Sequence, residues 1–177
     1  PGCVIRGVSS VAGSMTHIGG ALVLRNSGVN IRKVRTVVFD SAGKSMTAML
    51  GGHVDVVAGS MSISLAQLRN GGTRILGYSA PRRLGGELAQ IPTWREQGID
   101  VEFSNYRGII GPKGWSAAQV SYWGGVFADV DRDERWRADL EKNHLDRDFM
   151  ASRETRKYWD NLASPIRSTL DDLGLLK

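Results

Sequence analysis

The triplet Gly43-Lys44-Ser45 has the residue types that end a phosphate-binding loop, and it follows the β-branched run of VVFDSAGKS. Such a loop would bind the phosphates of ATP, but it needs a first glycine five positions before the second one. Only then can its backbone N–H groups wrap around the phosphates. That position is Val38, and Asp40 would face the phosphates with like charge. ATP is therefore not the expected ligand.

Two loops of small residues remain as candidate anion sites, SSVAGSMTH at 9–17 and FDSAGKS at 39–45. Each lies between an expected strand and an expected helix, where free backbone N–H groups and the helix dipole favour negative charge. In an open parallel sheet, loops at the carboxyl ends of strands line the ligand crevice. A carboxylate fits both features, since hydroxyl groups of the first loop can also donate hydrogen bonds. These hydroxyl residues are Ser9, Ser10, Ser14 and Thr16.

Both loops also have a purely structural interpretation, in which Ser14 caps one helix and Asp40 caps the next. One helix terminus contributes at most about 2 kcal/mol to anion binding. Micromolar binding needs about 8 kcal/mol. Tight binding would therefore require a second wall that closes over the ligand.

The sequence offers no residue grouping for catalysis or for a metal. The segment GVSSV lacks the second glycine of a G-x-S-x-G nucleophile elbow. His17, His53 and His144 are far apart and lack metal-ligand spacing. His17 follows Gly13 by four residues and is expected in the first turn of its helix, where a structural hydrogen bond is favoured over a role in orienting the loop or contacting a ligand. Asp55 is expected to fix a loop, and we expect no enzyme activity, no metal and no cofactor.

Composition limits the function classes. With 177 residues and 41% hydrophobic residues, the chain can form one domain, or a domain with part of another. Its apolar runs are far shorter than the roughly 20 residues that span a bilayer. The net charge of +5 is scattered, and in DVDRDERWRADLEK it alternates in sign, which favours a small anionic ligand over nucleic acid. Cys3 is alone, so an intrachain disulfide is impossible. The abrupt start at Pro1, without a signal peptide, suggests a fragment or a processed chain.

The first half alternates short strands with helices, which predicts a parallel sheet with covering helices. Gly28, Gly51-Gly52 and the NGG at 70–72 are expected to end the three helices. The expected strands are Val4–Gly7, Val34–Phe39, Val54–Ala58 and Thr73–Tyr78. The first expected helix begins at Ser14, and the other two span Ser45–Leu50 and Met61–Arg69.

From Pro81 onward the chain changes character. A connecting segment with one short helix leads to two extended stretches at 101–103 and 107–111. Three amphipathic helices follow at about 116–128, 131–142 and 152–172, with Ser152 as the expected N-cap of the last. Three tryptophans, Trp123, Trp136 and Trp159, are expected to pack on apolar helix faces. The boundary between the α/β part and the helical part is expected near 100–106.

The order of these motifs resembles the tripartite tricarboxylate transporter substrate-binding proteins, the Bug receptors. That family has a small-residue loop followed by His, a PYKG loop, ALLGGQVDV, an RxLAV strand, PTxxEQG and WRGxxAPxG. The corresponding segments here are GVSSVAGSMTH, VVFDSAGKSMTAMLGGHVDVVAGS and GGTRILGYSAPRRLGGELAQIPTWREQGIDVEFSNYRGIIGPKG. The resemblance extends from Pro1 to about Gly114, with a looser helical tail.

The resemblance implies an α/β type II periplasmic binding fold, in which two lobes joined by two crossing strands enclose a carboxylated ligand. Residues 1–103 would form the second lobe, with a parallel or mixed sheet and an incomplete start. Residues 104–177 would form the return crossing, EFSNYRGIIGP, and the C-terminal helices of the first lobe. The ligand-binding residues that we predict from the resemblance and the loops are Ser9, Ser10, Gly13, Ser14, Thr16, His17, Phe39, Asp40 and Ser41.

Three departures from the family pattern accompany the resemblance. The N-terminal half of the first lobe, with its glycine-rich ligand loop, is missing. The PYKG loop has become FDSAG, which replaces a cationic position near the ligand with an acidic one. Tyr106 stands where the family usually has Trp.

We therefore expect a fragment of a periplasmic, extracytoplasmic receptor that captures small carboxylates for a tripartite tricarboxylate-type transporter. The resemblance implies membrane transporter subunits as partners, with no nucleic acid. The face left by the missing segment is a candidate surface for a homo-oligomer. One alternative is the ligand-sensing effector domain of a transcription regulator. A second is a small hydrolase that acts through His17 and a serine.

Overall fold

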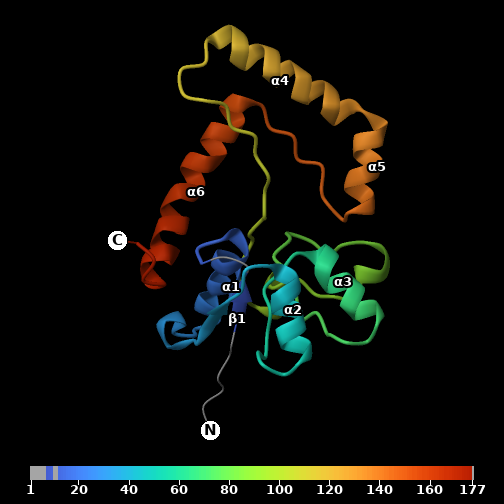
Figure 1. Ribbon diagram of the computed structural model, residues 1–177, viewed down its shortest axis with the longest axis vertical. Coiled ribbons are helices and arrows are strands. Elements are labelled where there is room, and N and C mark those ends of the chain that lie inside the picture. Colours follow the sequence, from blue (N-terminus) through green and yellow to red (C-terminus); the bar gives the residue numbers. More distant parts are fainter. Residues whose placement is uncertain (1–6, 10–11, 177) are drawn as a thin grey trace. The chain divides into compact units, whose positions relative to one another are not determined.

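The computed structural model describes the backbone of residues 7–9 and 12–176, and side chains from Ala12 onward (Figure 1). The described residues fall into two compact units. The first unit contains the residues through Tyr106 together with those from Ile166 on, and the second contains Arg107–Pro165.

The first unit contains a parallel strand pair. Strand β1 (Gly7–Ser9) pairs with β2 (Thr36–Val38), and Ser9 lies opposite Val38. The connection between them holds helix α1 (Met15–Asn26) and the short 3-10 helix η1 (Ile31–Lys33), as a parallel crossover requires. The predicted parallel arrangement is therefore confirmed for this pair. The predicted strand at 4–7 overlaps β1 at Gly7 alone, because its other residues lie outside the described part.

The two further predicted strands are not formed. Residues 54–58 pair with no strand among the described residues, and residues 73–78 contribute one isolated parallel bridge between Tyr78 and Thr93. Around that bridge the Trp94 N–H donates to the Tyr78 carbonyl at 3.1 Å. β-Branched residues favour a half-buried surface, which need not be a sheet. Val54 is such a β-branched residue, because it is buried against Ala48 without belonging to a strand.

Helix α1 begins and ends where the sequence predicted. Ser14 is its N-cap, and Gly28 follows the C-cap with a φ of +79°. Its glycine pair allows close packing on one side. A Cβ at Gly19 would lie 3.0 Å from the Phe103 ring, and one at Gly20 would lie 3.1 Å from Cβ of Ala58.

Helix α2 (Ala42–Leu50) begins three residues earlier than predicted, and Ser41, not Asp40, is its N-cap. The hydroxyl of Ser41 accepts the Lys44 N–H at 3.2 Å, so the segment that we predicted to be loop is the first turn. Helix α3 (Met61–Arg69) has the predicted bounds. Two short 3-10 helices, η2 (Gly86–Leu88) and η3 (Arg95–Gln97), lie in the connecting segment.

The second unit contains helices α4 (Ala117–Arg132) and α5 (Glu134–Lys142) and most of α6 (Ser152–Asp172). The segment after α5 is fixed by the Arg147 guanidinium, whose Nε donates to the buried carboxylate of Asp131 at 2.9 Å. Helix α6 crosses the unit boundary at Pro165.

Two predictions about this helical part need correction. Ser152 is the first residue of α6 and not its N-cap, because the Ala151 carbonyl accepts the Thr155 N–H at 2.9 Å. Trp123 stacks on Phe127 of the same helix with ring centroids 5.9 Å apart, yet it stays 42% exposed, and Trp136 stays 40% exposed. These two rings are half-covered surface residues and do not form a core.

Candidate functional site

The two candidate loops leave the same end of the parallel strand pair. Because Ser9 lies opposite Val38, the loop into α1 and the loop into α2 begin on neighbouring strands, about 5 Å apart (Figure 1). Both helices start within a few residues of these strand ends. The strand ends that precede the two loops are therefore adjacent, while residues 10 and 11 of the first loop lie outside the described part.

The first loop is held by hydrogen bonds within itself. Gly13 has a φ of +74°, a conformation that favours glycine, and its N–H donates to Nδ1 of His17 at 3.1 Å. Ser14 Oγ accepts the His17 N–H at 3.4 Å and lies 3.1 Å from the Thr16 hydroxyl. The Gly13 N–H therefore points to His17, not to a ligand. Ser10 and the side chain of Ser9 lie outside the described residues.

His17 is held in one protonation state by this arrangement. An Nδ1 atom that accepts an N–H carries no proton, so the neutral ring has its proton on Nε2. Nε2 is buried and has no hydrogen-bond partner within the described part of the chain. Burial lowers the pKa of His17 below its ordinary value, which agrees with a neutral ring.

The second loop combines available backbone donors with a local ion pair. The N–H groups of Ala42 and Gly43 have no acceptor among the described residues, as expected at a helix start. Asp40 forms an exposed ion pair with Lys44 at 2.6 Å. Ser45 is buried and its hydroxyl donates to the Ala42 carbonyl at 2.8 Å. Ser45 is thus not placed as the cation-binding serine of a phosphate-binding loop.

Phe39 faces the protein interior. It packs against the buried pair Ala48 and Val54 together with other partly buried residues of the first unit. This position indicates a role in the core. Phe39 was predicted as a ligand-binding residue, and its packing gives no direct support to that role.

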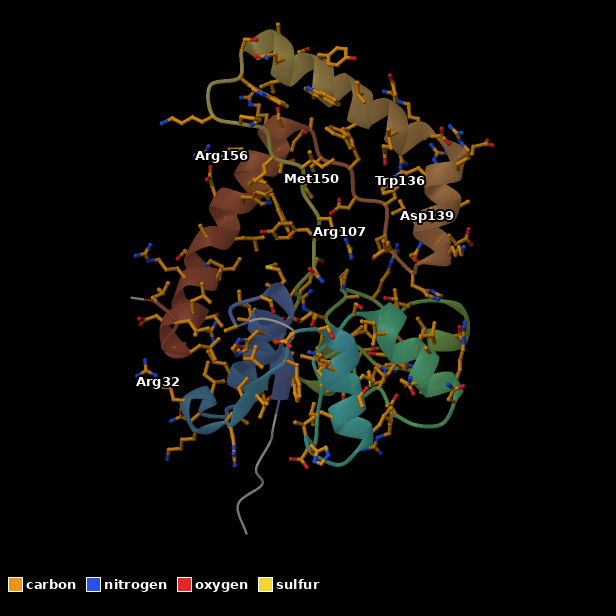
Figure 2. The ribbon with its side chains drawn as sticks, viewed as in Figure 1. Arg32, Arg107, Trp136, Asp139, Met150 and Arg156 are labelled. Carbon is orange, nitrogen blue, oxygen red and sulfur yellow. The ribbon has the colours of Figure 1, made fainter. Side chains whose placement is uncertain are left out.

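The C-terminal end of α6 supports the first loop, which the sequence did not predict. A Cβ at Gly13 would lie 3.4 Å from Leu170 Cδ2, so this leucine fills the space beside the glycine. Asp172 forms ion pairs with Arg25 at 3.2 Å and with Arg32 at 3.9 Å. Arg32 is labelled in Figure 2. No sequence motif indicated this, because the contacting residues are far apart in the chain.

Catalysis and metal binding each need particular groupings of side chains. Within the part that the structure describes, no group of three His, Cys, Asp or Glu residues could hold a metal ion. A hydrolase of the kind considered above needs a nucleophile bonded to its base. The Nδ1 of His17 is bonded to a backbone N–H, and Nε2 has no partner among the described residues. Among the described helices, none is long and apolar enough to cross a membrane.

Comparison with solved structures identifies the fold. The structure is similar to a TctC solute-binding protein from Polaromonas, solved without ligand, with a TM-score of 0.69 and 21% identity. The match covers 97% of this chain and 57% of that one. The fold is therefore of the periplasmic solute-binding class.

Sequence comparison then gives the family. The chain is 25% identical over 167 residues to a Cupriavidus necator protein, UPF0065 protein in gbd 5'region. The matched region covers 93% of this chain and 50% of that protein. The model of the tripartite tricarboxylate transporter family receptor matches residues 3–175. The chain belongs to this family, as the sequence motifs predicted, and it spans about half the length of the relatives that it matches.

Proposed function

We propose that the chain is the ligand-loop part of a periplasmic receptor that captures small carboxylates for a tripartite tricarboxylate-type transporter. The observation that supports this proposal is the register of β1 and β2, in which the strand ends that precede α1 and α2 are neighbours. Family membership supports the receptor class. The receptor binds its solute and does not transform it.

The proposed contacts are hydrogen bonds from two helix starts. The N–H groups at the start of α2 and the hydroxyls of Ser14 and Thr16 would replace water around carboxylate oxygens. Ser41, Ser9 and Ser10 complete the proposed set. Gly13 and His17 would act by holding the first loop in place.

The proposal predicts weak binding by this chain. Two helix starts at about 2 kcal/mol each give about 4 kcal/mol, which corresponds to a dissociation constant of about 1 mM. A second lobe would close over the ligand and supply the remaining binding energy in the longer relatives. We propose that residues 1–103 belong to the ligand-loop lobe and that residues 104–177 come from the other lobe, although the end of α6 from Ile166 on belongs to the first compact unit.

The partners follow from the same proposal. The membrane subunits of the transporter would recognise the closed receptor. Large apolar side chains such as Ile109, Ile110 and Tyr122 are exposed on the second unit, and we propose that these residues take part in self-association. Sedimentation over a concentration range, with Ile110→Ser as the variant, tests this last point.

Titration followed by nuclear magnetic resonance tests the binding itself. Citrate, succinate and glutamate are added to the ¹⁵N-labelled chain at constant ionic strength, with chloride as the control anion. We expect at least one carboxylate to shift the amide signals of 14–17 and 42–45, and Ser41→Ala to weaken that effect. The matched control is Ser60→Ala, because Ser60 is an N-cap without a side-chain cap bond. Shifts that are absent, or that chloride reproduces, would contradict the proposal.

A further inference from the structure

The turn at Gly13 contains a hydrogen bond between a backbone group and a side chain. The Gly13 N–H donates to His17 Nδ1 at 3.1 Å across one turn of chain. On its other side Gly13 lies against Leu170. With a φ of +74°, Gly13 holds a conformation that other residues adopt only with strain. The turn is therefore fixed by an acceptor on one side and by packing on the other.

The second loop has no equivalent of this bond. There the side-chain acceptor is the N-cap itself, Ser41, which accepts the Lys44 N–H. The first loop has the corresponding cap in Ser14, and His17 adds a second acceptor that takes the N–H of the residue before the cap. The imidazole thus restrains a part of the turn that an ordinary helix cap does not reach.

We propose that His17 is a positioning residue, whose neutral ring holds the Gly13 N–H inward and thereby orients the neighbouring N–H and hydroxyl groups toward the solute. The effect on solute capture rests on the proposed function, whereas the hydrogen bond itself does not. Protonation of Nδ1 would place one donor against another, so the bond exists only with the neutral ring. Burial of Nε2 keeps that state dominant near neutral pH.

Two substitutions separate the acceptor from the ring. His17→Asn keeps an acceptor, because its Oδ1 occupies about the place of Nδ1. His17→Phe keeps a ring of similar size and removes the acceptor. We expect the rate at which the Gly13 amide exchanges with water to rise about tenfold in His17→Phe, as for a lost hydrogen bond of about 1.4 kcal/mol. In His17→Asn the rate should stay within about twofold of the wild type.

The tautomer of His17 provides a direct readout of the hydrogen bond to Gly13. Long-range ¹H–¹⁵N spectra of the full chain at pH 7.5 should show Nδ1 without a proton and Nε2 with one. The same spectra of His17→Asn identify the His17 signals by their loss. A proton on Nδ1, or equal exchange of Gly13 in the wild type and His17→Phe, would overturn the proposal. If His17→Phe does not fold, the tautomer and His17→Asn decide it.

The effect on solute binding is measured with whichever of citrate, succinate and glutamate gives the largest shifts of the amide signals in the wild type. Its affinity should fall about fivefold or more in His17→Phe and recover in His17→Asn. An unchanged affinity together with a changed Gly13 exchange rate would show that the bond exists but does not position the site, and would overturn the positioning role. If no carboxylate binds the wild type, the proposed function fails, and the tautomer and exchange results still decide the hydrogen bond.

Discussion

Asp172, the last residue of α6, accepts a hydrogen bond at 3.2 Å from the guanidinium of Arg25, near the end of α1. The two residues are 147 positions apart. In the same region Leu170 lies beside Gly13. The end of the chain therefore supports the helix whose first turn carries one of the two candidate loops.

Asp172→Asn should weaken this support only modestly. Both side chains of the pair are about one third exposed, so we expect the free energy of unfolding in urea to fall by less than about 1 kcal/mol. The exchange rate of the Gly13 amide should rise more clearly, because the local support is lost. Asp160→Asn is the control, since its exposed pair with Arg156 lies elsewhere on the same helix (Figure 2). Equal effects of the two variants on Gly13 would contradict the coupling.

The glycines of helices α1 and α4 should respond in opposite ways to alanine. At Gly124 a Cβ meets nothing within 4 Å, so Gly124→Ala should raise the free energy of unfolding by about 0.5–1 kcal/mol through helix propensity. At Gly20 a Cβ would lie 3.1 Å from Cβ of Ala58, which is tighter than ordinary contact. Gly20→Ala should therefore be destabilising, as overpacking is. Urea unfolding of both variants measures the difference, and a stabilised Gly20→Ala would show that α1 can shift away from Ala58.

The sequence predicted the local features that depend on a few neighbouring residues. The Ser14 start, the Gly28 end and the bounds of α3 follow from capping and from glycine at positive φ. The family motifs likewise depend on residue order, and the family is confirmed. The pairing of β1 with β2 followed from the alternation of strand and helix.

Two of the wrong or missed predictions depend on partners distant in the chain, and one depends on a local competition between two capping residues. Whether residues 54–58 form a strand depends on a neighbour with free hydrogen-bonding groups, and in the described residues Val54 instead packs in the core. At α2 we placed the cap one residue too early, because Asp40 and Ser41 are both good N-caps. Asp40 instead pairs with Lys44, one turn further along. The support of Gly13 by Leu170 had no local signal at all.

Acid should destabilise the chain through His17. Burial places the folded-state pKa of His17 below the unfolded value of 6.5, so the unfolded state binds a proton more readily. The stabilisation is complete above pH 6.5 and is lost as pH falls through the folded pKa. The charged groups on neighbouring elements, Asp172 and Asp40, are paired with Arg25 and Lys44.

Urea unfolding between pH 7.5 and 5.5 measures this effect in the wild type and in His17→Asn. We expect the free energy of unfolding to fall with pH in the wild type, and the slope to be smaller in the variant. His144→Asn is the control, because the exposed His144 lies outside the loop. A slope that His17→Asn leaves unchanged would assign the acid sensitivity to other groups.

The Asp40–Lys44 pair should set how strongly the second loop attracts an anion. Asp40 is 85% exposed beside the N–H groups of Ala42 and Gly43, and Lys44 compensates its charge at 2.6 Å. Asp40→Asn removes a negative charge next to the proposed carboxylate position, so it should raise affinity for citrate about threefold at low salt. Lys44→Ala leaves Asp40 uncompensated and should lower affinity by a similar factor. The double variant should lie between the two, and citrate titrations at two ionic strengths check the electrostatic origin, because both effects should shrink as salt is added.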